Sequence, residues 1–178
     1  MKKLLIPFIL ITAALFQSCR GPEGREGLPG EDGLIGQTAE IKNVNFNAAN
    51  DWQVRRDYQS VKLGFVESDV ILVYVLWSVA NNTPVWRLVP QAIDSPRGVF
   101  YNFDFTRSDF TVFLDAPNDN LLASLSATFT QNQTFRIVAV PSEFSSRKGG
   151  APVDYKDYEA MKKYFNLDES KVKKIILD

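Results

Sequence analysis

Residues 99–106 read Val-Phe-Tyr-Asn-Phe-Asp-Phe-Thr, and this stretch decides the fold class. One set of alternate positions is wholly apolar and the other is mostly polar: Val99, Tyr101, Phe103 and Phe105 against Phe100, Asn102, Asp104 and Thr106. A period of two residues is typical of a half-buried β-strand, because successive side chains point to opposite faces of a sheet. The same period recurs at Phe110, Val112 and Leu114, which predicts a second strand.

Residues 70–79, upstream of these strands, form an apolar run that predicts a central strand covered on both faces. A turn signal, Asn81-Asn82-Thr83-Pro84, follows it and leads into a predicted strand at residues 85–89. Residues 135–140 predict a further buried strand, which Pro141 ends. Weaker strand candidates are residues 41–47, 52–55, 59–65 and 125–130.

One segment is ambiguous between helix and strand. Leu121, Leu122 and Leu125 are equally compatible with a short helix, because short apolar runs do not separate the two periods. With this segment left open, seven to nine short strands separated by turn signals favour a mainly β domain over residues 39–148. We expect a β-sandwich of two sheets, immunoglobulin-like or jelly-roll-like, and the sequence leaves its topology open.

The C-terminal segment, residues 149–178, has a helical period. Tyr155, Tyr158, Met161 and Phe165 recur at helical spacing, with Asp154 or Asp157 able to cap the first turn and Lys162 and Lys163 near the end. The pattern restarts after Leu167, with Val172, Ile175 and Ile176 on one apolar side. Six lysines balance six acids over residues 154–178, which favours helices packed on the sandwich over a basic helix lying on lipid.

The N-terminal segment has the layout of an export signal. Lys2 and Lys3 precede an apolar run, Leu4 to Phe16, which is too short to span a bilayer comfortably, and Gln17-Ser18-Cys19 follows. Cys19 is the only cysteine of the chain. We therefore expect residues 1–18 to be a signal peptide and Cys19 to be the site of lipidation; without it, no thiol remains for a disulfide.

Glycine occupies every third position directly after Cys19: Gly21, Gly24, Gly27, Gly30, Gly33 and Gly36. This Gly-X-Y pattern resembles collagen, in which only glycine fits at the axis of three chains. Two prolines stiffen the run, and four acidic residues face only Arg25. We therefore favour a flexible stalk over residues 19–38, with a homotrimeric stem as the alternative.

Two further stretches carry a family resemblance. Thr130-Gln131-Asn132-Gln133-Thr134-Phe135-Arg136-Ile137-Val138-Ala139-Val140-Pro141 and Val153-Asp154-Tyr155-Lys156-Asp157-Tyr158 look like the C-terminal half of short collagen-like lipoproteins of Bacteroidota. The order of parts is also similar: lipid cysteine, Gly-X-Y stub, β-rich domain, tyrosine-bearing helix. The resemblance implies acylation of Cys19, palmitate-type chains included, and anchoring in the cell envelope. Arg20 in place of an aspartate favours the outer membrane. The family supplies no activity.

Composition excludes several kinds of chemistry. The chain has no histidine, which removes Ser-His-Asp and Cys-His catalysis and histidine-bound zinc. No Walker-type phosphate loop occurs. The net charge is −1, from 20 basic and 21 acidic residues, so nothing attracts nucleic acid. Carboxylate chemistry of the glycosidase type is what remains.

Two sets of residues are candidates for binding. Trp52, Trp86 and Tyr101 are candidates for stacking on a glycan, although aromatic residues of a sheet more often belong to its core. Asp115, Asn118, Asp119 and Asn120 form a loop rich in the oxygen ligands that calcium prefers, although such residues also make turns without metal.

These observations lead to one expected function and one alternative. We expect a lipid-anchored outer-membrane protein that displays a β-sandwich as a binding or structural module without catalytic activity. Its partners would be the membrane and either a glycan or an envelope protein, and the protein would be a monomer. The alternative is a carboxylate-dependent hydrolase that acts on polysaccharide or peptidoglycan.

Overall fold

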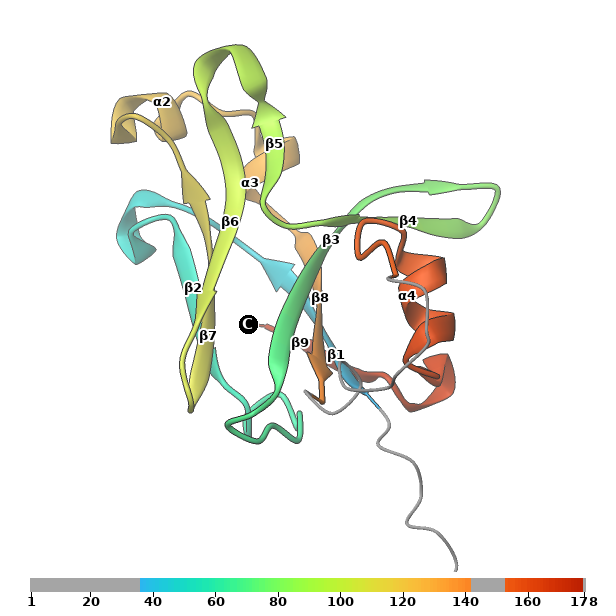
Figure 1. The fold of residues 1–178 in the computed structure, drawn as a ribbon. Helices are drawn as coiled ribbons and strands as arrows, with labels where there is room; N and C mark the ends of the chain where they lie inside the picture. The colour runs from blue at the N-terminus through green and yellow to red at the C-terminus, as the bar shows by residue number, and fades with distance from the viewer. Residues whose placement is uncertain (1–35, 142–152, 178) are drawn as a thin grey trace, which may run out of the picture. The chain divides into compact units, whose positions relative to one another are not determined.

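The computed structural model describes residues 36–141 and 153–177. It is mainly β, with two sheets and a short C-terminal helix, so the predicted β-sandwich is confirmed (Figure 1). The predicted signal peptide, the lipidated Cys19 and the glycine repeat as far as Gly33 lie outside the described residues. The strands are β1 (Gln37–Val44), β2 (Gln53–Asp57), β3 (Val70–Ala80), β4 (Thr83–Leu88), β5 (Gln91–Asp94), β6 (Val99–Phe105), β7 (Asp109–Asp115), β8 (Gln133–Val140) and β9 (Lys173–Ile176).

Short helical elements connect and cover the strands. The α-helices are α2 (Asp119–Ala123), α3 (Ala127–Thr130) and α4 (Tyr158–Tyr164), and the 3-10 turns are η1 (Ala48–Asn50), η2 (Ser95–Arg97) and η4 (Glu169–Lys171).

The two sheets have the strand orders β4-β3-β8-β1-β9 and β2-β7-β6-β5. All neighbours are antiparallel except β1 and β9, which run parallel. The pairing is nested, because β1 pairs with β8 and β2 pairs with β7. This order differs from the immunoglobulin arrangement, in which the first two strands lie side by side in one sheet.

The strongly patterned segments form the predicted strands. Residues 99–106 and 110–114 lie in β6 and β7, and residues 135–140 lie in β8 at the centre of the five-stranded sheet. The apolar run at 70–79 lies in β3, and its first half is covered on both faces, as predicted. From Ser78 onward β3 is exposed, because its pairing with β8 ends at Val75 and the rest projects as a hairpin with β4 (Figure 1).

Two of the weaker strand candidates are wrong. Residues 59–65 form turns, although Val61 and Leu63 are buried, because the loop folds over the end of the core. Residues 125–130 contain α3 rather than a strand, and Ser126 caps that helix. Leu121 and Leu122 lie in α2, so the helical alternative is confirmed for them. The short strand β5 was not predicted.

The space between the sheets holds the main core. Inward-facing side chains of β1, β3 and β8 meet those of β6 and β7 there. Its central members include Ile41, Val73, Phe135, Ile137, Val99, Tyr101, Phe110 and Val112. This core forms because the strand registers turn the apolar positions of each sheet toward the other sheet.

A second core lies on the outer face of the five-stranded sheet, beneath α4 (Figure 1). Met161 and Phe165 of the C-terminal segment are buried against Tyr74, Val138 and Val140 of the sheet. Asp157 caps α4 through the backbone N–H of Ala160 at 3.0 Å, as one of the two predicted caps. Tyr155 lies before the helix and is exposed, so the helix is one turn shorter than predicted.

The chain end differs from the prediction. Residues 169–171 form the single turn η4, and Lys173–Ile176 form strand β9 instead of a second helix. Strand β9 pairs with β1 and turns Ile175 toward the main core, because β1 would otherwise be an open edge. The C-terminal segment therefore contributes both a helix and a strand, β9, to the sandwich.

Candidate functional site

The most buried polar cluster connects the C-terminal segment to the sheet. Arg136 on β8 is 4% exposed and donates a hydrogen bond of 2.8 Å to Glu40 on β1, which is 5% exposed. Its other terminal nitrogen donates to Glu169 at 2.9 Å and to the hydroxyl of Tyr158. Burial opposes the charge, but the hydrogen bond to Glu40 and the charges around the guanidinium prevail and raise the pKa of Arg136. Through these contacts, the cluster connects β1 and β8 of the sheet to α4 and η4 of the C-terminal segment.

Trp86, one of the three aromatic residues predicted to bind a glycan, packs against this cluster. The guanidinium of Arg136 lies over its ring, 4.1 Å from the centroid, and Tyr158 packs beside it. Trp86 is 9% exposed, so most of its ring is used in this packing. That it binds a glycan stays a prediction.

Tyr101 is also a core residue. It is 1% exposed, and its ring packs against Phe46 and Phe135. Its hydroxyl donates to the carbonyl oxygen of Phe129 at 2.7 Å and to Oε1 of Gln133 at 3.0 Å. Burial raises the pKa of Tyr101 well above its ordinary value. Strand β6 therefore turns Tyr101 into the main core, and glycan stacking by this residue stays a prediction.

The predicted calcium loop leads into helix α2, and one of its residues caps that helix. The side-chain oxygen of Asn118 accepts a hydrogen bond of 3.0 Å from the N–H of Leu121 and caps α2, and Asp115 accepts one of 3.3 Å from Asn102. Residues 36–141 and 153–177 contain no cluster of three or more His, Cys, Asp or Glu side chains placed to hold a metal ion. Asp119 and Asn120 line a pocket.

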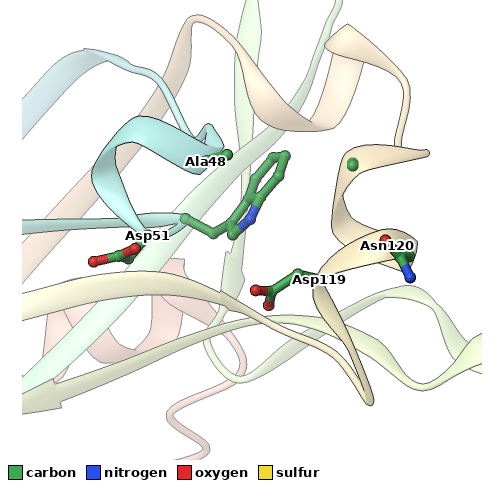
Figure 2. Close-up of a pocket in the computed structure, with 6 residues that line it drawn as sticks. Ala48, Asp51, Asp119 and Asn120 are labelled. Carbon is green, nitrogen blue, oxygen red and sulfur yellow. The ribbon is translucent and has the colours of Figure 1, made fainter.

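This pocket unites residues from both predicted sets. Trp52, Asp119 and Asn120 line it together with Ala48, Asp51 and Ala123, around a volume of about 300 Å³. Figure 2 shows Ala48 and Asp51 on one wall and Asp119 and Asn120 on the other. The sequence analysis missed Asp51, Ala48 and Ala123, and only its selection of the neighbouring Trp52 pointed to this turn.

The local sequence explains how Trp52 reaches the pocket. Asn47 and Asn50 form a reciprocal cap around η1, in which each side chain accepts a backbone hydrogen bond of 2.9 Å. The next two residues, Asp51 and Trp52, both have left-handed backbones, with φ of 52° and 57°. Such a conformation costs about 1–3 kcal/mol in a residue other than glycine and clusters at functional sites. Hydrogen bonds at both ends of Trp52 hold it, from its N–H to Asn47 O and from Leu114 N–H to its carbonyl, both 3.0 Å.

The pocket lies at the end of the sandwich opposite to Gly36. Strand β1 starts next to Gly36 and ends at Val44, and the chain then passes through η1 to Trp52. The loop after β2 lies at the end of the sandwich near Gly36. There the N–H of Gly64 donates a hydrogen bond of 2.8 Å to Oε1 of Gln37. The five residues of β2, Gln53–Asp57, therefore separate the two ends by on the order of 16 Å, at about 3.3 Å per residue.

Two shallower hollows lie along β2, on the open edge of the four-stranded sheet. Arg55 and Arg56 border both. Asp109 accepts hydrogen bonds from Arg55 and Thr106, and the Arg55 contact holds the pKa of that carboxyl below its ordinary value. The amides of Asn45, Asn47 and Asn50 are used by the local turn. Unlike the Trp52 pocket, these two hollows are lined by no aromatic side chain.

Comparisons with protein-family models, with curated proteins and with solved structures find no match for this chain. Over the part of the chain that the structure describes, no helix is long and apolar enough to cross a membrane.

Proposed function

We propose that this chain is a lipid-anchored protein of the cell envelope, in the outer membrane, which displays its β-sandwich as a glycan-binding module. The anchor is Cys19, placed directly after the apolar N-terminal run. The binding site is the pocket of Trp52, Asp51, Asp119 and Asn120. A glycan suits this pocket better than an envelope protein does, because the pocket is small and polar around one aromatic side chain.

One observation carries the proposal: two segments 67 residues apart bring an aromatic side chain and three free polar side chains to the end of the sandwich away from Gly36. The anchor would precede Gly36 in the chain, so the point of attachment would not lie at the pocket end of the domain. The residues upstream of Gly36 are long enough to act as a spacer, whether flexible or stiff, so the pocket would be accessible above a membrane.

A glycan array tests the binding. The mature protein in detergent is expected to bind a subset of glycans, and Trp52→Ala is expected to abolish the signal. Trp77→Ala is the matched control, because Trp77 lies on the projecting hairpin, outside the pocket, with Arg87 over its ring. Equal binding by the Trp52 variant, or no binding by the unchanged protein, would count against the proposal.

A cysteine variant tests the anchor. Cys19→Ala should abolish acylation and move the protein out of the detergent-rich membrane fraction, since no other thiol exists to carry a diacylglycerol. Mass spectrometry of the purified chain would show the loss of acyl mass. Ser78→Ala is the control, because it changes a small, exposed polar residue on the β3–β4 hairpin. Membrane retention with an unchanged mass would show that Cys19 is not the anchor.

A hydrolase is the second candidate, because Asp51 and Asp119 line the same pocket as a possible carboxylate pair. Release of reducing ends from a bound glycan, lost in Asp119→Asn, would favour this candidate.

A further inference from the structure

We propose that the Trp52 pocket selects a single sugar unit rich in hydrogen-bond donors, neutral or bearing a free amine, and excludes acidic sugars. This inference rests on the proposed function and assigns the chemical class of its ligand. It follows from three features of the pocket: the unpaired carboxylates, the absence of a cation in the lining, and the size.

The first feature is the state of the two carboxylates. Within residues 36–141 and 153–177, some carboxylates form ion pairs, for example Glu40 with Arg136 and Asp94 with Arg97, whereas others, such as Asp104, form none. In the same described ranges, Asp51 and Asp119 have neither an ion pair nor a side-chain hydrogen bond to the protein. Their four oxygens are therefore available as acceptors, and an ionised carboxylate can only accept.

The second feature is the charge of the lining. The six lining residues contain two acids, one amide and no lysine or arginine. A ligand carboxylate placed among them would meet like charges, which is unfavourable, whereas hydroxyl groups would donate to the aspartates and an ammonium group would pair with them. The indole of Trp52 adds to this preference, because its face attracts cations and the C–H face of a neutral sugar.

The third feature is the size. The volume of about 300 Å³ is at the lower limit for ligand sites, and Ala48 and Ala123 keep it open because they are small. Such a pocket fits one sugar unit or the end of a chain, rather than a long polymer.

The test uses three matched oligosaccharides with the same linkage: one of neutral hexose, one of hexosamine with free amines, and one of uronic acid. The full mature protein in detergent is titrated with each. We expect binding of the neutral and amine-bearing forms, about two- to fivefold tighter for the amine at low salt, and no binding of the uronic acid. The preference for the amine should decrease at high salt, because exposed charges are screened.

Two charge-neutralising variants locate the selectivity. Asp51→Asn combined with Asp119→Asn should remove the preference for the amine and allow the uronic acid to bind. Asp104→Asn is the control, because it removes one exposed carboxylate from β6, outside the pocket. Asparagine keeps the side-chain size, so these variants leave the packing of the domain unchanged.

The outcomes separate the two claims. If no saccharide binds the unchanged protein, the proposed function fails. If saccharides bind, and Trp52→Ala abolishes binding, but the uronic acid binds as well as the neutral form or the double variant leaves the selectivity unchanged, the function stands and the inference about ligand class is overturned.

Discussion

Gly36 packs against Leu167, so closely that a Cβ added to Gly36 would lie 2.6 Å from Leu167 Cδ2. Gly36 is the sixth glycine of the triplet repeat and directly precedes β1. Its partner Leu167 belongs to the segment after α4. The repeat therefore runs into β1 without an intervening linker.

Gly36→Ala should lower the free energy of unfolding by about 1–3 kcal/mol, because the added methyl group overpacks the contact with Leu167. Urea denaturation of the chain from Arg20 onward measures the change. Gly24→Ala is the control from the same repeat and should leave stability unchanged. Equal effects of the two variants would contradict the special role of Gly36.

Arg136→Met should cost about 3–5 kcal/mol, because it leaves the carboxylate of Glu40 buried without its partner. Combining it with Glu40→Gln should recover part of this loss, since no unpaired charge then remains. Arg107→Met breaks an ion pair with Glu67 that is largely exposed and should change stability little. Thermal denaturation of five proteins provides the comparison: the unchanged protein, Arg136→Met, Glu40→Gln, their combination and Arg107→Met. Additive effects of the two single variants would contradict a coupled pair.

Truncation after Gly150 should lower stability by several kcal/mol. It removes Tyr158, Met161 and Phe165, each of which contributes about 1.5–3 kcal/mol through burial, and it also exposes β1 by removing β9. Met161→Ala is a milder version, expected to cost about 2–5 kcal/mol. Chemical denaturation checks both, and unchanged midpoints would mean that the C-terminal segment adds nothing to the fold.

Sedimentation should find the chain from Arg20 onward to be a monomer at micromolar concentration. Only five triplets precede Gly36, and ordering three chains costs more conformational entropy than so few contacts return. The competing expectation is a trimer with a cooperative low-temperature transition that Gly27→Ala abolishes.

Deleting residues 20–35 should also leave the unfolding temperature unchanged if the repeat is a stalk.

Stability should fall steeply at alkaline pH. Burial raises the pKa of Tyr58 to about 12 and raises the pKa values of Tyr74, Tyr101 and Tyr158 even further. Unfolded tyrosine ionises near pH 10, so this contribution is complete below pH 10 and is lost as the pH rises through the folded values. The urea concentration at the midpoint of unfolding, measured between pH 8 and 12, reports this loss of stability. Tyr101→Phe should flatten the decrease, and a midpoint that does not change up to pH 12 would contradict it.

The fold could be predicted where the pattern is local and long. Residues 99–106 alternate over eight positions, and Asp157 stands directly before the apolar face of α4, so neighbours in the chain specify both elements. The predictions for the short segments were wrong because distant parts of the chain determine the structure of these segments. Residues 59–65 are apolar because a loop covers the core, and residues 173–176 form a strand because β1 offers an open edge. Neither cause is visible in a short window of sequence.

The candidate site shows the same division. Trp52 was selected for its aromatic ring, and Asp119 and Asn120 for their oxygens, but nothing in the sequence joined the two sets. The pairing of β2 with β7 joins them, because it sets the turn before β2 beside the helix that follows β7. Asp51 was missed because its importance comes from the left-handed turn that it shares with Trp52.

By itself, the sequence determined the β-rich class of the domain and the presence of a capped C-terminal helix, since side-chain period and helix caps act over a few residues. Only the tertiary structure decided which aromatic residues are accessible. Trp86 lies under Arg136, Tyr101 lies between the sheets, and Trp52 lines an open pocket. The physical reason is that burial depends on the register and packing of strands far apart in the chain, and a one-residue shift in register would turn every side chain to the other face.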